Sequence, residues 1–204
     1  QGSVLSPSLF AIYIDIIASR FLPMDSGYIV LYADDILLIS PSVSELQKML
    51  VTCESDLASL DMLINASKSS CIRIGSRYNV KCANLTTSSG HELQWANEIH
   101  YLGVYVTCSR HFQCSICHCT KSFYRAINAI FGKIGRNSSE EVFLQLIYSK
   151  CIPVLIYGLE CFDLNNTTKR ALDFPVVRLL MRFFKTSNID VVNECRTYFE
   201  FELP

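Results

Sequence analysis

The sequence predicts an α+β fold in which an antiparallel hairpin with packed helices precedes an all-α region. Two short apolar runs, 28–32 and 36–39, flank an acidic centre, which is typical of a β-hairpin. Apolar residues recur at helical spacing over 46–60 and again from about residue 115 to the end. We therefore predict a β-containing region over 1–110 and an all-α region over 111–204.

The composition limits the kinds of partner that the chain can have. Charged residues make up 18% of its 204 residues, whereas a typical domain has roughly a quarter. This low charge favours surfaces that pack against further protein. The net charge of −1 excludes a uniformly basic chain, so any nucleic-acid-binding surface must be local. Because both ends lack the features of natural termini, we expect a fragment of a longer protein.

The cysteines and the apolar runs bear on location. Ten cysteines lie scattered in apolar segments, as Cys53 and Cys151 do, and no basic stretch followed by an apolar run opens the sequence. We expect reduced core thiols in an intracellular protein of the cytoplasm or nucleus. No apolar run reaches the roughly 18 residues needed to cross a bilayer, so we expect no membrane partner.

The first predicted elements are a helix and the hairpin. Ser6 suits an N-cap and Pro7 a first turn, and a helix is predicted to extend to about Arg20. A turn at 23–27 leads into the hairpin, which we expect to be buried.

The remaining elements follow from the same periodicities. A helix is predicted over 43–61 with Ser42 or Ser44 as its cap. Further along the chain we predict a polar turn at 65–70, a strand at 71–75, a loop at 76–90, a strand pair formed by 93–95 and 99–106, and helices at 115–135, 139–163 (interrupted by Pro153) and 168–184.

Two carboxylates occupy the tip of the predicted hairpin. Tight hairpin turns favour Gly or Asn, yet Ala33, Asp34 and Asp35 stand here. Carboxylates in an apolar setting cost stability unless they are partnered. Mg²⁺ prefers such hard oxygen ligands, and Mn²⁺ is an alternative, so we interpret Asp34 and Asp35 as metal ligands. The competing interpretation is a plain polar turn.

Four segments resemble those of reverse transcriptases, in the order of that family. Gln1–Phe10 (QGSVLSPSLF) resembles the Gln-Gly-x-x-Leu-Ser-Pro-x-Leu-Phe motif, and Tyr32–Asp35 (YADD) matches the Tyr-x-Asp-Asp box. Asn65–Ser69 (NASKS) and Tyr101–Gly103 (YLG) resemble two further motifs. The forms are most similar to LINE-type (non-long-terminal-repeat) retrotransposons. The resemblance implies a partial polymerase palm at 1–110 and a thumb-like or connecting region at 111–204.

The resemblance also implies the substrates and the residues that contact them. RNA template, DNA primer and deoxynucleotide would be the partners. Asp34 and Asp35 would be catalytic metal ligands, and Lys68 would protonate or neutralise the pyrophosphate leaving group, unless it is an ordinary solvated lysine. The predicted nucleotide-binding residues are Gln1 and Gly2, and the predicted primer-binding residues are Tyr32, Leu102 and Gly103, of which the last two can also be read as an ordinary strand end.

A basic helix face forms the last candidate site. Four cations of the predicted helix 115–135 and its end fall within about a third of the circle at about 100° per residue, opposite an apolar face, and they are Lys121, Arg125, Lys133 and Arg136. They suit contacts to a nucleic-acid backbone, although a solvated face explains them as well.

The family has another catalytic Asp on a strand before the Gln-Gly motif, and it has fingers. Neither is recognisable in these 204 residues. We therefore predict that the chain alone is inactive and that its partner is the N-terminal fingers and palm segment of the same polyprotein.

Three alternatives remain at this point. One is a non-catalytic remnant of a decayed or domesticated retroelement that binds nucleic acid or protein. Another is an RNA-dependent RNA polymerase, although that class normally has Gly where Ala33 stands. The third is a zinc module built from Cys114, Cys117, His118 and Cys119.

Overall fold

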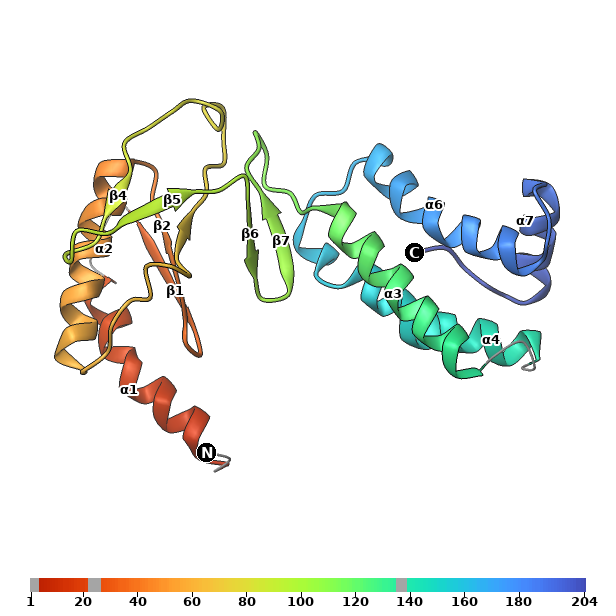
Figure 1. Cartoon of the computed structure of the whole chain (residues 1–204), viewed down its shortest axis with the longest axis horizontal. Coiled ribbons are helices and arrows are strands. Elements are labelled where there is room, and N and C mark those ends of the chain that lie inside the picture. The colour runs from red at the N-terminus through yellow and green to blue at the C-terminus, as the bar shows by residue number, and fades with distance from the viewer. Residues whose placement is uncertain (1–3, 22–26, 135–138) are drawn as a thin grey trace. The chain divides into compact units, whose positions relative to one another are not determined.

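Two compact units make up the chain in the computed structural model, which describes residues 4–21, 27–134 and 139–204 (Figure 1). The first unit comprises the residues up to Arg73 together with Asn79–Ala96. The second comprises Ile74–Tyr78 together with Asn97–Pro204. The mixture of helices and small sheets confirms the α+β prediction. The assignment of 1–110 to a palm and of 111–204 to a thumb stays a prediction.

Two helices cover one face of a hairpin in the first unit. Helix α1 (Ser6–Phe21) precedes strands β1 (Tyr28–Tyr32) and β2 (Asp35–Ile39), and helix α2 (Val43–Ser59) follows them. Side chains from both helices form the buried core of this layer, namely Ile14, Ile17, Met49, Cys53 and Leu57. The predicted positions of these four elements are confirmed.

Helix α2 begins where the sequence predicts. The Ser42 hydroxyl accepts a hydrogen bond from the backbone N–H of Glu45 at 3.2 Å, so Ser42 rather than Ser44 is the N-cap. This bond satisfies one of the backbone donors that a helix start leaves without an intrahelical partner.

The hairpin is only half buried, which corrects the prediction of a buried hairpin. Ile29 and Leu31 pack on the helices. The alternate residues Tyr28, Val30 and Tyr32 are 76%, 42% and 60% exposed. Because successive side chains of a strand point to opposite faces, one face of this two-stranded sheet is apolar and open.

A second sheet in the first unit has the strand order β3-β5-β4. Strand β3 (Ser70–Cys71) runs parallel to β5 (Glu92–Trp95), and β4 (Leu85–Thr86) runs antiparallel to it. The predicted strand 71–75 is therefore wrong beyond Cys71, and the predicted loop 76–90 contains β4. These strands are too short for period-2 alternation to reveal them.

The predicted pairing of 93–95 with 99–106 is also wrong. In the second unit, β6 (Glu98–Tyr101) and β7 (Val104–Thr107) pair with each other. The turn that joins them is Leu102–Gly103, with φ of +47° and +83°. Positive φ at both central residues is the signature of a type I′ hairpin turn, and Gly suits it.

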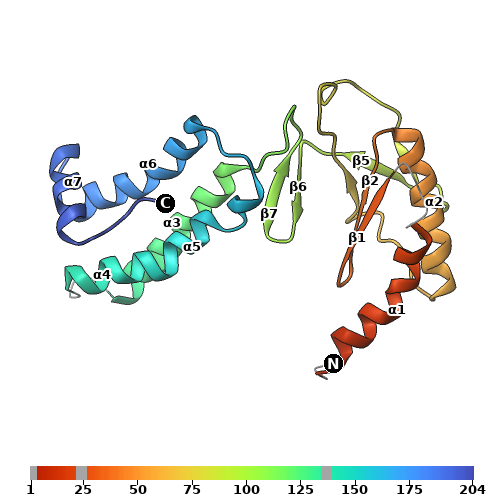
Figure 2. The same ribbon diagram turned by 180° about the vertical axis from the view of Figure 1, so that it is seen from behind.

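The rest of the second unit is helical. Its elements are α3 (Ile116–Ile134), α4 (Glu140–Leu146), the π-helix η1 (Ile147–Cys151), α5 (Ile152–Ile156), the 3₁₀-helix η2 (Leu159–Cys161), α6 (Asn166–Phe183) and α7 (Ile189–Tyr198). Figure 2 shows α3 and α5 from behind, and these two helices pack on each other. The core they share is led by the fully buried Phe123, Ile147, Leu155, Val176 and Leu180.

The predicted helix 139–163 is a chain of shorter helices, and Pro153 lies in the first turn of α5, where a missing N–H is tolerated. Helix α7 was not predicted, because only Val192 of its ten residues is buried and its apolar pattern is weak. The prediction that no apolar run is long enough to cross a bilayer is wrong by length and composition alone, because the described helical run Glu140–Cys161 passes that test. Here this run supplies Ile147, Cys151 and Leu155 to the core, as a core helix does.

Candidate active site

The tip of the β1–β2 hairpin holds the predicted acidic pair. Tyr32 pairs with Asp35 across the strands, so Ala33 and Asp34 alone form the turn. Ala33 has a φ of +51°. A positive φ at the first central residue is the sign pattern of a type II′ turn, which favours Gly there. The predicted hairpin is confirmed, and its turn places a side chain in the left-handed region.

Both carboxylates at this tip are exposed to solvent. Asp34 is in the turn, and Asp35 is the first residue of β2. The strand pairing of β1 with β2 therefore sets the backbone position of both residues. Their oxygens are the hard ligands that Mg²⁺ takes, and they fit part of such a site. Within the described residues, no group of three or more His, Cys, Asp or Glu side chains could hold a metal ion. Mg²⁺ is commonly bound through one or two carboxylates together with waters and substrate phosphates.

Tyr32 lies next to the acidic pair. It is 60% exposed on the open face of the hairpin and faces Asp35 across the two strands. An aromatic side chain in this position can contact a nucleic acid that approaches the carboxylates.

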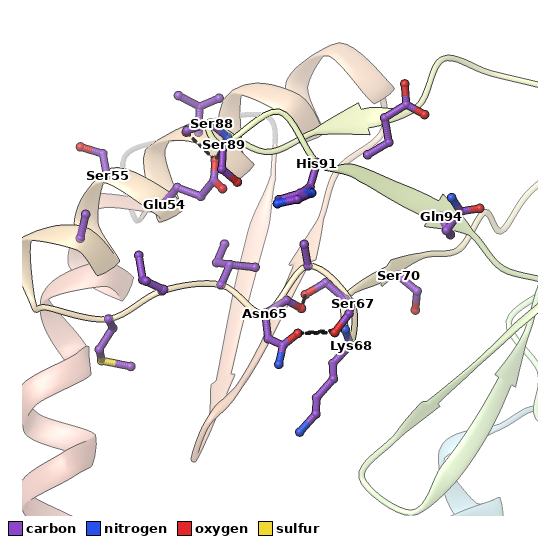
Figure 3. Close-up of a pocket in the computed structure, with 18 residues that line it drawn as sticks. Glu54, Ser55, Asn65, Ser67, Lys68, Ser70, Ser88, Ser89, His91 and Gln94 are labelled. Atoms are coloured by element: carbon purple, nitrogen blue, oxygen red, sulfur yellow. Dashed lines mark hydrogen bonds between the residues drawn. The ribbon is translucent and has the colours of Figure 1, made fainter.

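Lys68 lies on a tight polar turn between α2 and β3. Asn65 Oδ1 accepts hydrogen bonds from Ser67 Oγ at 2.7 Å and from the Lys68 N–H at 3.3 Å. Figure 3 shows the Lys68 side chain extending from this turn. It lines an open groove of about 1320 Å³ with residues of α2 and β5. Among the described residues that line the groove, neither Asp34 nor Asp35 occurs.

Hydrogen bonds of Glu54 and Gln47, which the sequence did not reveal, join α2 to the segment 86–88. Of these residues, Glu54 and Ser88 line the groove. Glu54 accepts hydrogen bonds from the Ser88 N–H at 2.8 Å and from its hydroxyl at 2.7 Å (Figure 3). Gln47 bonds to both backbone groups of Thr86, at 2.7 and 2.9 Å. These bonds span 34 and 39 residues of sequence, so no local pattern could have indicated them.

The predicted primer-binding pair forms the turn of the β6–β7 hairpin in the second unit. Leu102 is 39% exposed. Its carbonyl accepts a hydrogen bond from the Tyr157 hydroxyl at 3.2 Å. Tyr157 was missed by the sequence reasoning, because it lies 55 residues away.

The predicted basic face of α3 is on the surface. Lys121, Arg125 and Lys133 are exposed, whereas Phe123 and Ile127 are buried. No acidic residue occurs within α3. The helix thus has one packed face and one basic face. Three predicted site residues, Gln1, Gly2 and Arg136, lie outside the described residues.

The side chains of the cysteine cluster at the start of α3 make hydrogen bonds and a ring contact. His118 Nε2 is 3.0 Å from Glu98 Oε1, and the His118 ring stacks on Tyr105 with centroids 3.7 Å apart. Cys119 Sγ donates to the Ser115 carbonyl at 3.8 Å. Burial raises the pKa of the Cys114 and Cys119 thiols above the ordinary value of 9.0.

Comparison with known proteins assigns the family. The family model described as reverse transcriptase (RNA-dependent DNA polymerase) matches residues 1–106. No curated protein and no solved structure matches the chain. The match includes the hairpin with Asp34 and Asp35, the Lys68 turn and the Leu102–Gly103 turn. The chain belongs to the reverse transcriptase family.

Proposed function

We propose that this chain is the carboxyl-terminal part of the polymerase region of a LINE-type retrotransposon and that it contributes to RNA-templated DNA synthesis. The observation that carries the proposal is the strained Ala33 turn, which presents Asp34 and Asp35 at the tip of the hairpin. A local conformation that costs stability is typical of functional sites. In this reaction a primer 3′-hydroxyl attacks the α-phosphate of a deoxynucleotide, and pyrophosphate leaves.

Each proposed residue has one task in that reaction. Asp34 and Asp35 would hold Mg²⁺, or Mn²⁺ in its place. When bound there, the ion would stabilise negative charge on the attacking and leaving oxygens. Lys68 would neutralise the leaving pyrophosphate or give it a proton, and Gln1 and Gly2 would line the nucleotide pocket.

The proposed primer contacts are assigned within each unit by itself. In the first unit, Tyr32 on the open face of the β1–β2 hairpin would contact the primer terminus. In the second unit, Leu102 and Gly103 of the β6–β7 turn would contact the primer backbone. The exposed Lys121, Arg125 and Lys133 of α3 would contact phosphates further along, together with Arg136. Because α3 carries no acid, its exposed face is locally positive on a chain of net charge −1.

A further palm segment that supplies another carboxylate is part of the proposal. Two adjacent aspartates are too few for a two-metal centre, which needs additional ligands. The open face of the hairpin and an exposed apolar stripe of α1 that includes Leu9, Ile12 and Ile16 favour packing of such a segment. We propose that the chain alone does not extend a primer and that the whole polymerase works inside cells.

The second candidate is a non-catalytic remnant that binds nucleic acid. The basic face of α3 favours it, because that face does not depend on a metal. The description of the matching family favours DNA synthesis over RNA synthesis as the inherited reaction.

Primer extension tests the proposal. An RNA template annealed to a DNA primer is incubated with deoxynucleotides and Mg²⁺, together with either the chain alone or a chimera in which the fingers and first palm segment of a reverse transcriptase precede it. The chimera should extend the primer, and the chimera with Asp34→Asn should not. The chain alone should give no product.

Asp173→Asn, which changes a partly buried aspartate of α6 in the second unit, is the matched control and should leave extension by the chimera intact. Extension by the chain alone that Asp34→Asn abolishes would overturn the proposal that a further carboxylate is needed. A folded chimera that binds the duplex but gives no product would favour the non-catalytic candidate.

A further inference from the structure

The segment that connects α5 to η2 in the second unit contacts the β6–β7 turn, which we propose to contact the primer. Tyr157 follows the end of α5, and Gly158 follows it as the residue before η2. The Tyr157 hydroxyl donates a hydrogen bond to the carbonyl of Leu102 at 3.2 Å. This places a residue outside the matched range 1–106 directly on the β6–β7 turn.

The ring of Tyr157 also fills the space over Gly103. A Cβ added to Gly103 would lie 2.9 Å from Tyr157 Cε1, a separation that real Cβ atoms do not adopt. Two observations favour Gly at position 103, since its φ is +83° and a side chain there would have to displace the Tyr157 ring.

The contact is reciprocal one residue further along both segments. Gly158 has a φ of +70°, and a Cβ added to it would lie 2.6 Å from Cγ2 of Val104. Each segment thus has a glycine against which a side chain of the other segment packs. The Tyr157 ring packs on Gly103, and the Val104 side chain packs on Gly158. The buried Leu159 immediately after Gly158 fixes this segment to the helical core.

A π-helix lies in the backbone segment that precedes Tyr157. The π-helix Ile147–Cys151 precedes α5, and π-helical turns are frequent at functional sites. Ile147 and Cys151 are fully buried, so the register of the segment is fixed by packing. The Tyr157 side chain is nevertheless 59% exposed, which leaves it accessible beside the turn.

We propose that Tyr157 is a positioning residue for the primer, acting through the Leu102–Gly103 turn. Its hydroxyl holds the Leu102 carbonyl and its ring covers Gly103, which fixes the direction in which the turn presents its backbone to a primer strand. This inference rests on the proposed function, because that function assigns the primer contact to Leu102 and Gly103.

The test compares binding of a DNA primer annealed to an RNA template by the 204-residue chain and its variants, measured by fluorescence anisotropy at low salt. Tyr157→Phe removes only the hydroxyl and should weaken binding about threefold, less than the full energy of one hydrogen bond, because the bond lost lies within the protein and not to the primer. Tyr157→Ala also removes the ring and should weaken binding more. Tyr148→Phe changes another exposed tyrosine of the same helical region and should not alter affinity.

Two further measurements separate positioning from loss of structure and from failure of the proposed function. In Tyr157→Phe, the NMR signals of Leu102 and Gly103 should shift while the thermal unfolding curve stays close to that of the parent chain. The double variant Lys121→Ala with Arg125→Ala should weaken binding of the duplex independently of any effect of the Tyr157 variants. Unchanged affinity in Tyr157→Phe and Tyr157→Ala, with weaker binding in the α3 variant, would overturn this inference alone. Unchanged affinity in all of them would overturn the proposed primer contacts as well.

Discussion

At the tip of the β1–β2 hairpin, Ala33 has a φ of +51°, in a region that L-residues other than Gly, Asn and Asp rarely enter. The sequence predicted this conflict, because a two-residue turn was expected where neither Gly nor Asn occurs. What the sequence could not predict was which residue takes the positive φ. That depends on the pairing of Tyr32 with Asp35, which makes Ala33 the first residue of the turn.

Replacing Ala33 by Gly should stabilise the chain. Release of the left-handed strain outweighs the extra entropy of Gly, so the free energy of unfolding should rise by roughly 0.5–1 kcal/mol. Urea denaturation measures this. The matched control is Ala129→Gly on the exposed side of α3, which should lower stability by about 1 kcal/mol. A loss of stability in Ala33→Gly equal to that of the control would contradict the account.

Three buried thiols should resist alkylation. Burial raises the pKa of Cys53, Cys71 and Cys151 to about 11. Iodoacetamide at pH 8 should therefore modify the exposed Cys117 and Cys161 first, as read by peptide mass spectrometry. Equal modification of Cys151 and Cys117 in the folded chain would contradict the burial described here.

The same thiols make stability depend on pH in the alkaline range. Their pKa is higher in the folded chain, about 11, than the ordinary value of 9.0, so the folded state keeps protons that the unfolded state loses. The stabilisation is complete below pH 9 and should decline as the pH rises to about 11. Urea midpoints measured across this window should fall. Cys151→Ala should reduce the decline, and an unchanged slope would argue against a contribution from this thiol.

Among the elements, those with long local signals were predictable. Helix α2 combines a serine cap with apolar residues at helical spacing, and the β1–β2 hairpin combines two apolar runs with a short turn. The second sheet was not predictable, because β3 and β4 have two residues each and pair with β5 from distant parts of the sequence. Tyr157 could not be assigned to the β6–β7 turn for the same reason.

Helix α6 offers a test of capping with an internal control. The side chain of Asn165 accepts a hydrogen bond from the Thr168 N–H at 2.8 Å, whereas Asn166 is the first residue inside the helix. Asn165→Ala should lower the free energy of unfolding by about 1 kcal/mol. Asn166→Ala should change it little or raise it slightly, because Ala has the higher helix propensity. Thermal or urea unfolding of both variants measures these changes. A larger loss of stability in Asn166→Ala than in Asn165→Ala would place the N-cap at Asn166.

For the whole molecule, a net charge of −1 coexists with a helix whose only charged residues are basic. Contacts between such a face and phosphates release counterions, so affinity for nucleic acid should fall as salt rises. Replacing both Lys121 and Arg125 by Ala should lower the slope of log affinity against log salt by about 2.

The control for this slope replaces Lys169 and Arg170 by Ala, which removes the same charge from the exposed first turns of α6. This control should leave the slope close to that of the parent chain. Equal effects of the two double variants would show that the net charge of the molecule, and not the face of α3, attracts nucleic acid.

The acidic hairpin is the centre of the account, and its affinity for divalent ions can be measured without any reaction. Mn²⁺ is paramagnetic, so a titration into the ¹⁵N-labelled chain should broaden the amide signals of Ala33–Ile36 first, and Mg²⁺ in excess should restore them. In Asp34→Asn this early broadening should be lost while the fold is kept. Broadening that begins elsewhere, or that Asp34→Asn leaves unchanged, would contradict the assignment of this hairpin as the metal-binding part of a polymerase centre.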